Sequence, residues 1–236
     1  MSVIALQRQV KLASLENSCK LVVQACGNDD FPFLRDSSNS PPFFFMYRCL
    51  FEVFGLILPL TAFQCVLLEH LNMASAKLHP NSIAIVRAFE ILCPFFNIQP
   101  SVLVFLFFFQ MKLTGEIGWV SLNNVSKKLF KFDSNIFHHF KDYFFNVLAT
   151  SVVTDDTPLM FNRDGEPYFP FYWQFDPTRF KWYDEDLLNL VKKTDKAILE
   201  KLSTSLDAQV ILSLPSVSDP LVVVDGKVPN LALDCV

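Results

Sequence analysis

The sequence has few glycines and lacks the glycine-rich loops that hold phosphate groups. Only 6 of its 236 residues are glycine, and no G-x-x-x-x-G-K-[ST] or G-x-G-x-x-G pattern occurs. Such loops need glycine because backbone amides must approach the phosphate closely. The G-x-S-x-G turn of a nucleophilic serine is also missing. We therefore expect no cofactor and no small-molecule ligand.

Charged residues are also scarce. They form 19% of the chain, against about 25% in an average globular protein. The net charge is -4, so a broad basic field is missing, which argues against strong non-specific binding of nucleic acid. The net charge does not exclude a local basic patch. Phenylalanine is abundant instead, with 26 residues. This excess indicates either a very aromatic core or an apolar surface that contacts a partner or a membrane.

Cysteine and histidine do not occur at the spacings of a metal site. The six cysteines include no C-x-x-C pair, and the adjacent His138 and His139 point apart on a helix or a strand. The even number of cysteines would allow disulfides. Because no signal peptide is present, we instead expect free, buried thiols in an intracellular protein of the cytoplasm or nucleus.

No apolar run is long and continuous enough for a membrane-spanning helix. Residues 101–111 reach about half of the roughly 20 residues that a bilayer requires. Residues 50–68 are interrupted by Glu52, Pro59 and Gln64. Both stretches are predicted to be buried helices, and membrane association remains a minor alternative.

The pattern predicts an α+β fold that is mainly helical. Residues 1–40 are interpreted as a partly disordered extension, 41–205 as a phenylalanine-rich helical domain with short strands or hairpins in its second half, and 206–236 as a tail. Residues 43–54 are predicted to form the first helix, closed by Gly55. Its aromatic residues recur at helical spacing and are Phe44, Tyr47, Phe51 and Phe54.

Two helix starts follow. Thr61-x-x-Gln64 is a capping-box pattern, and Asn72 suits the left-handed end of that helix. The predicted apolar face consists of Phe63, Val66, Leu67, His70 and Leu71, with His70 interpreted as a partly buried histidine rather than a ligand. In the turn 78–82, Pro80 forces the preceding histidine into an extended conformation, and the next helix is expected to be capped by Asn81 or Ser82.

Two ion pairs are predicted in the middle of the chain. Arg48 and Glu52 form an i,i+4 pair, and Arg87 and Glu90 an i,i+3 pair. Pro94 should end or kink the helix that contains the second pair. The predicted apolar face of that helix consists of Ile85, Phe89, Leu92 and Phe96. Ser101 is expected to cap a central helix over 102–111 that is apolar all round.

The second half has weaker patterns. Alternation predicts a strand at 119–122, with 129–132 as a candidate partner, while 137–148 fits either a helix or a strand. Residues 159–169 resemble a hairpin around Asp164-Gly165. A last helix opens with acids at 184–186, and its predicted apolar side consists of Leu187, Leu190, Val191, Ile198 and Leu202.

Catalytic interpretations find little support. A group of acidic residues would suit two-metal chemistry, namely Asp155, Asp156, Asp164 and Asp176, but acidic loop residues are usually only solvated. Cys93 with His79 would be a conceivable nucleophile pair. A core thiol and a turn histidine are the preferred interpretation, and we predict neither catalytic nor metal-binding residues.

Several stretches occur together in the order of a known family. They are FFFMYRCLFEVFGLILPLTAF (43–63), LEHLNMASAKLHPNSIAIVRAFEILC (68–93), PSVLVFLFFFQMK (100–112), GWVSL (118–122), FKDYFFNV (140–147) and DGEPYFPFYW (164–173). The chain thereby resembles a plant family of gypsy-type transposon domains, which also carries the label transposase. Ile83 and Leu60 replace a tryptophan and a phenylalanine usual in that family, and its long coiled-coil tail is missing.

The resemblance implies an origin in a long-terminal-repeat retrotransposon and no catalytic residues. The matching positions are interpreted as fold determinants and are Leu78, His79, Pro80, Asn81, Ser82, Arg87, Phe89, Glu90, Trp119, Tyr172 and Trp173. We expect a non-enzymatic, gag-like domain that self-associates or binds element RNA or DNA. The alternatives are a transposase or integrase-accessory protein, a membrane-associated fragment, and a degenerate copy without function.

Overall fold

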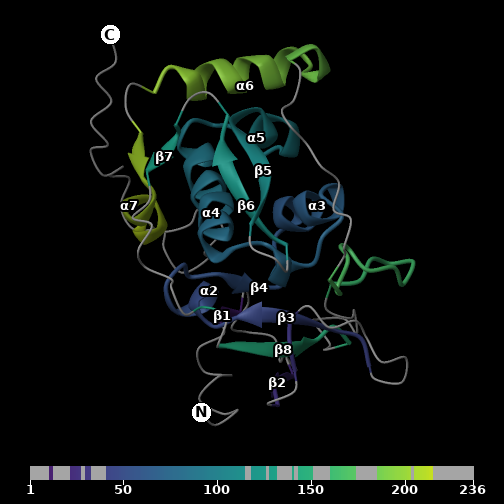
Figure 1. The fold of residues 1–236 in the computed structure, drawn as a ribbon. Coiled ribbons are helices and arrows are strands. Elements are labelled where there is room, and N and C mark those ends of the chain that lie inside the picture. The colour runs from purple at the N-terminus through teal and green to yellow at the C-terminus, as the bar shows by residue number, and fades with distance from the viewer. Residues whose placement is uncertain are drawn as a thin grey trace.

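The prediction of an α+β fold is confirmed by the computed structural model (Figure 1). The structure describes residues 11–12, 22–27, 30–32, 41–114, 118–125, 128–131, 140, 143–150, 160–173, 185–202 and 205–214. Three helices and a hairpin form an upper body, and a three-stranded sheet lies below it (Figure 1). One extensive phenylalanine-rich core runs through both parts.

Helix α4 (Pro80–Phe95) is the centre of the upper body and is buried on most sides. Helices α3 (Ala62–His70) and α5 (Val102–Phe108) meet it through aromatic rings. Phe89 of α4 stacks on Phe63 with ring centroids 5.7 Å apart and meets the edge of Phe105 at 5.1 Å. Aromatic contacts of this geometry add to the free energy that burial alone supplies.

The predicted helix 102–111 is wrong beyond Phe108. There the chain straightens into β5 (Phe109–Thr114), which pairs antiparallel with β6 (Trp119–Asn124). The strand expected at 119–122 is thus confirmed, but its partner is β5 rather than 129–132. Two-residue strand β7 (Phe130–Lys131) pairs instead with β9 (Leu206–Asp207). A run that is apolar all round carries no periodicity, so it cannot show where a helix gives way to a strand.

The predicted helix 43–54 is also wrong over its first half. Residues Phe43–Tyr47 form β3, and only Cys49–Glu52 form a helix, α2. Strand β3 pairs with β8 (Phe144–Leu148), which also pairs with β2 (Val23–Ala25). Four consecutive residues of β3 are buried, so the chain has no solvent face there from which a helical stripe could be recognised. A further small pair joins β1 (Lys11–Leu12) to β4 (Ile57–Leu58).

Several helix ends follow the predicted chemistry. The capping box of α3 is present, Gly55 has φ +60, and Asn72 has φ 48. Pro94 lies in the last turn of α4, which ends at Phe95. Arg48 Nε lies 2.7 Å from Glu52 Oε1, as predicted.

Two finer predictions are wrong, and that of a cap at Ser101 is right in position only. Helix α4 is capped by His79 rather than by Asn81 or Ser82, because Pro80 occupies its first turn. The side chain of Ser101 makes no capping hydrogen bond, although it stands at the N-cap of α5. Val66 is exposed, since α3 turns Cys65 and Leu68 inward instead.

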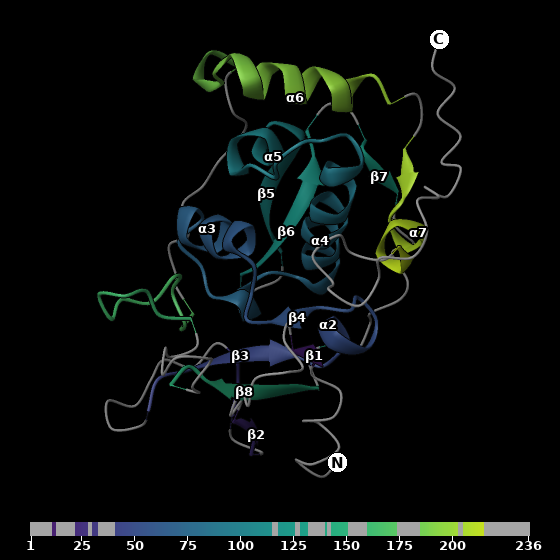
Figure 2. The same cartoon turned by 180° about the vertical axis from the view of Figure 1, so that it is seen from behind.

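The C-terminal described segment lies over the upper body (Figure 2). After a 3₁₀ turn, η4 (Glu185–Leu187), helix α6 (Leu190–Glu200) starts at the N-cap Asn189 rather than at the acids 184–186. Helix α7 (Ala208–Ser213) packs on α4 and buries Ala208 and Ile211. The chain predicted as a tail therefore contributes to the core at 206–214.

The predicted hairpin near residue 164 is present in compact form. Phe161 and Pro167 form an antiparallel bridge, and Gly165 at the tip has φ 82. Of the ambiguous stretch 137–148, the structure describes residues 140 and 143–148, and 144–148 are strand. His138, His139 and the predicted carboxylates Asp155, Asp156 and Asp176 lie outside the described residues.

Within the described ranges, no helix combines the length and the apolarity that a membrane crossing requires.

Candidate functional site

The turn 78–82 joins the start of α4 to the edge of β6. The His79 backbone N–H donates to the Val120 carbonyl at 2.8 Å, and Leu78 forms a parallel bridge with Val120. One step further, the Leu122 N–H donates to Ser82 Oγ at 2.8 Å. Strand β6 is therefore held by β5 along one edge and by the helix start along the other.

His79 serves this turn as a helix cap. Its Nδ1 accepts a hydrogen bond from the Asn81 N–H at 3.2 Å, and its backbone is extended at ψ 140, as Pro80 predicts. Cys93 lies fourteen residues along the same helix, which is about 21 Å at 1.5 Å per residue. Burial also raises the pKa of the Cys93 thiol. The two side chains therefore do not form a nucleophile pair.

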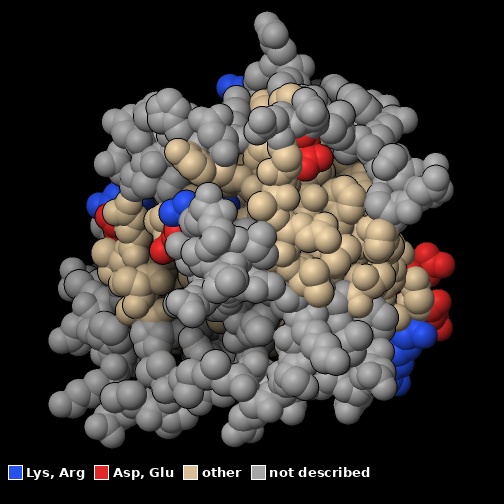
Figure 3. All heavy atoms as spheres, turned by 90° about the horizontal axis from the view of Figure 1, so that it is seen from below, with Lys and Arg blue, Asp and Glu red and all other residues tan. Residues whose placement is uncertain are grey.

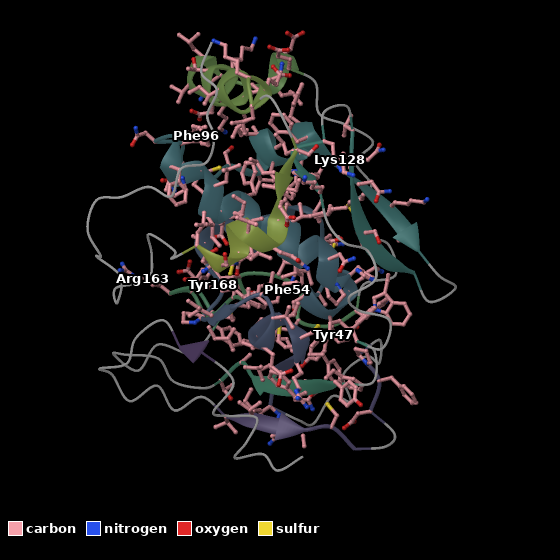
Figure 4. All side chains as sticks on the ribbon, turned by 90° about the vertical axis from the view of Figure 1, so that its left-hand side faces the viewer. Tyr47, Phe54, Phe96, Lys128, Arg163 and Tyr168 are labelled. Atoms are coloured by element: carbon pink, nitrogen blue, oxygen red, sulfur yellow. The ribbon has the colours of Figure 1, made fainter. Side chains whose placement is uncertain are left out.

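A buried cluster consists of Tyr47, Lys77, Trp119, Phe140 and Trp173, which we call the Tyr47 cluster. Trp119 Nε1–H donates to Tyr47 Oη at 2.9 Å, and the Tyr47 hydroxyl donates to the Ala76 carbonyl, also at 2.9 Å. Burial raises the pKa of Tyr47, so the hydroxyl keeps its proton and remains a donor. Tyr47 lies where the sheet meets the upper body (Figure 4).

Aromatic rings complete this cluster around a buried lysine. Trp119 and Trp173 meet edge-on with centroids 5.7 Å apart, and Phe140 meets the Tyr47 ring at 4.9 Å. Lys77 is 1% exposed, and its Nζ lies 4.8 Å from the Trp173 ring centroid. A cation over an indole face gains electrostatic stabilisation, which is larger where water is excluded. The cluster ties β3, β6 and the 3₁₀ turn η1 (Ser75–Lys77) together.

A second cluster surrounds the carboxylate of Glu90 in the middle of α4. Thr61 Oγ1 donates to one oxygen, Gln64 Nε2 donates to the other at 2.5 Å, and Arg87 Nη1 lies 3.7 Å away. The predicted Arg87–Glu90 pair is confirmed, although its side chains are only 7% and 9% exposed. Burial raises the pKa of Glu90, and the hydrogen bonds and Arg87 counter this only in part. The capping box of α3 is thereby bonded to α4.

The structure thus divides the predicted family positions into two groups. At the start of α4, the turn 78–82 bonds to β6, which carries Trp119, and Trp119 contacts Trp173. Further along α4, Glu90 bonds to Gln64 of α3 and pairs with Arg87. Phe89 contacts Phe105 of α5. Tyr172 belongs to neither group and meets Phe43 edge-on at 5.7 Å. The sequence did not single out Lys77, for which no motif gives a signal. It placed Tyr47 only on an apolar stripe.

The acidic and thiol candidates in the described residues do not converge. Asp164 lies in an exposed turn, where Asn162 Oδ1 accepts from the N–H groups of both Asp164 and Glu166 at 2.9 Å. No group of three or more His, Cys, Asp or Glu suited to a metal ion occurs among the residues the structure describes. Burial also raises the pKa of Cys49 to about 12.

The described residues line a small cavity and a larger open pocket. The small apolar cavity of about 30 Å³ lies between β3, α3 and α4 and is lined by residues that include Met46, Gln64 and Ile83. The open pocket of about 300 Å³ is lined by Arg48, Cys49, Glu52, Phe140 and Tyr143. Seen from below, the charged side chains lie mostly towards the edges of the described surface, with uncharged residues between them (Figure 3).

Comparison with known families gives one match. Residues 44–113 match a family model described as "Putative gypsy type transposon". The resemblance found in the sequence is thus confirmed for the segment from β3 to β5, which contains both α4 and the turn 78–82. The match supports a transposon-derived role. No curated protein and no solved structure matches the chain.

Proposed function

We propose that this chain is a non-enzymatic, gag-like domain of a gypsy-type element and that it acts by self-association. The family match supports an origin in such an element. A gag-like domain needs a rigid body that presents contact surfaces to other copies, and it needs no reactive centre.

The observation that carries the proposal is where the matched segment places its polar side chains. Lys77, Ser82 and Glu90 are buried or nearly buried, and each contacts another element of the same chain. Buried polar groups that are satisfied internally stabilise one arrangement of the fold. The matched segment thus builds a scaffold, and contacts with partners fall to the elements packed on its outside.

Light scattering coupled to size-exclusion chromatography of the full chain tests this proposal. The expected result is a defined oligomer whose population rises with concentration, with or without a short RNA. A chain that stays monomeric at every concentration, both with and without RNA, would overturn it. Metal-dependent nicking of DNA that is lost in Asp164→Asn would support the transposase alternative instead.

A further inference from the structure

Strand β5 forms an edge of its sheet. It pairs with β6 on one side, and no other strand of the described chain pairs with it. The teal hairpin of β5 and β6 stands at the margin of the molecule (Figure 4). An edge strand presents a row of main-chain N–H and C=O groups to any chain that can pair with them. The direction in which each residue of β5 points therefore decides what this edge offers.

The hydrogen-bond register of the hairpin shows which residues of β5 point outward. The Val125 N–H donates to the Phe108 carbonyl at 2.8 Å, and this bond flanks the position of Phe109. A flanking bond of this kind marks a non-hydrogen-bonded pair, and such pairs recur at every second position of an antiparallel ladder. The backbone N–H and C=O groups of Met111 and Leu113 therefore point away from β6.

The opposite strand has the same register. Val120 and Leu122 lie opposite these two residues and bond away from β5. The Val120 carbonyl accepts from the His79 N–H, and the Leu122 N–H donates to Ser82 Oγ, both at 2.8 Å. On β5 no equivalent exists: within the part of the chain that the structure describes, the outward groups have no hydrogen-bond partner. The edge of β5 is thus open to a further strand.

The side chains of β5 give this edge an apolar face and a polar face. Successive residues of a strand point to opposite faces, so Met111 and Leu113 share the face of the buried Phe109, and Gln110 and Lys112 share the other. Leu113 is 38% exposed and Met111 is half-buried at the margin of the core. Lys112 is exposed. A strand beside this edge thus needs apolar side chains on one face and negative charge near Lys112 on the other.

We propose that the outer edge of β5 binds an extended segment of a partner protein in which an acidic residue stands between two apolar residues. The segment lies antiparallel to β5. Its apolar residues form hydrogen-bonded pairs with Met111 and Leu113, and each such pair exchanges two N–H···O=C bonds. The acidic residue is directly opposite Lys112 in the intervening pair, where side chains approach most closely. This inference goes beyond the proposed self-association and does not depend on it.

The central lysine favours an acidic partner over a second copy of the chain. If two copies of β5 paired so that Met111 bonded to Leu113, each Lys112 would lie directly opposite its counterpart. Like charges in that position destabilise a sheet, and edge lysines prevent such pairing in natural proteins. A register centred on Met111 instead pairs Leu113 with Phe109, whose N–H is already bonded to the Phe105 carbonyl. An acidic segment avoids both costs.

Titration of the isotope-labelled full chain with a synthetic peptide tests the site by nuclear magnetic resonance. The probe is the acetylated and amidated peptide T-V-E-V-T, whose residues favour the extended conformation at four of five positions. We expect the amide signals of Met111 and Leu113 to shift most. N-methylation of both valines should abolish binding, because it removes the donors to the carbonyl groups of these two residues.

A charge swap tests the role of the lysine. Lys112→Glu should weaken binding of T-V-E-V-T roughly fivefold and strengthen binding of T-V-K-V-T, in which lysine replaces the glutamate. Lys201→Glu is the matched control, because Lys201 is exposed at the end of α6 and its substitution changes the net charge equally. It should leave both affinities unchanged. Circular dichroism should show both variants folded.

Hydrogen exchange of the free protein tests whether the edge is open. The amides of Met111 and Leu113 should exchange faster than that of Lys112, which bonds to β6. Equal protection of all three would show that the edge is already covered and would overturn the proposal.

The remaining outcomes separate this edge from self-association. Signals of Met111 and Leu113 that do not shift at millimolar peptide would overturn the proposal, as would binding that is indifferent to N-methylation and to the charge swap. Light scattering decides self-association independently. A monomeric chain that binds the peptide supports the edge and refutes self-association, whereas an oligomer that does not bind it gives the reverse result.

Discussion

Removing the hydroxyl of Tyr47 probes the cluster that joins the sheet to the upper body. Tyr47→Phe takes the acceptor from Trp119 Nε1–H and the donor from the Ala76 carbonyl. A buried polar group left without its partner costs about 1–3 kcal/mol, so we expect a loss of about 2–4 kcal/mol in the free energy of unfolding. The ring stays, so the contact with Phe140 and the packing volume are unchanged. This loss is a large share of a typical stability of about 5–15 kcal/mol.

Urea unfolding followed by far-UV circular dichroism measures this loss. Tyr168→Phe is the control, because Tyr168 is 46% exposed, and we expect a change within about 0.5 kcal/mol. A Tyr47→Phe variant as stable as this control would refute the bridging role of the hydroxyl.

A double-mutant cycle with Trp119→Phe sharpens the test. Once the Tyr47 hydroxyl is gone, the Trp119 indole has already lost that acceptor. The second substitution should then cost about 1 kcal/mol less than it costs alone. Additive losses would show that the two side chains act independently.

Three further changes address the other contacts. Ser82→Ala removes the acceptor of the buried Leu122 N–H and should cost about 1–3 kcal/mol in urea unfolding; an unchanged midpoint would contradict the contact between α4 and β6. Burial raises the pKa of Glu90 above its usual 4.5, so the folded state binds the carboxyl proton more tightly than the unfolded state does. The stability that this proton contributes is therefore complete below pH 4.5 and is lost as the pH rises. Glu90→Gln lacks this titration, so its free energy of unfolding should rise relative to that of wild type from acid to neutral pH. A difference between the two proteins that stays constant with pH would contradict the raised pKa. Gly55→Ala should lower the free energy of unfolding by about 1 kcal/mol, because Gly55 has φ +60 although no atom would contact the added Cβ. Gly27→Ala is the control, since its Cβ would meet only ordinary contacts, and it should cost less in the same urea assay.

The correct predictions concern interactions between residues close in sequence. The capping box Thr61–Gln64, the extended His79 before Pro80, and the pair Arg87–Glu90 each span at most four residues. Their geometry follows from local dihedral angles and helix spacing, which a sequence pattern records directly. The same pattern could not show that Gln64 and Thr61 also bond to Glu90, since that contact requires α3 to pack on α4.

Helix α6 shows the opposite case. Its predicted apolar side combined Leu187, Leu190 and Val191, which the structure leaves exposed, with Ile198 and Leu202, which pack inward as predicted. The structure also places Leu199 and Lys196 inward, because Lys196 finds carboxylates and an aromatic ring there. Periodicity shows that two sides differ, but it does not tell which side the rest of the chain covers.

The sequence by itself determined the α+β class, the capping box of α3 and the resemblance to a gypsy-type transposon family. These follow from composition and from interactions over a few residues. Only the tertiary structure decided that 43–47 and 109–114 are strands, that Tyr47 bonds Trp119 across 72 positions, and that Leu190 and Val191 of α6 are exposed. The physical reason is that a continuous apolar run is compatible with either backbone, and the choice depends on hydrogen-bond partners that other parts of the chain supply.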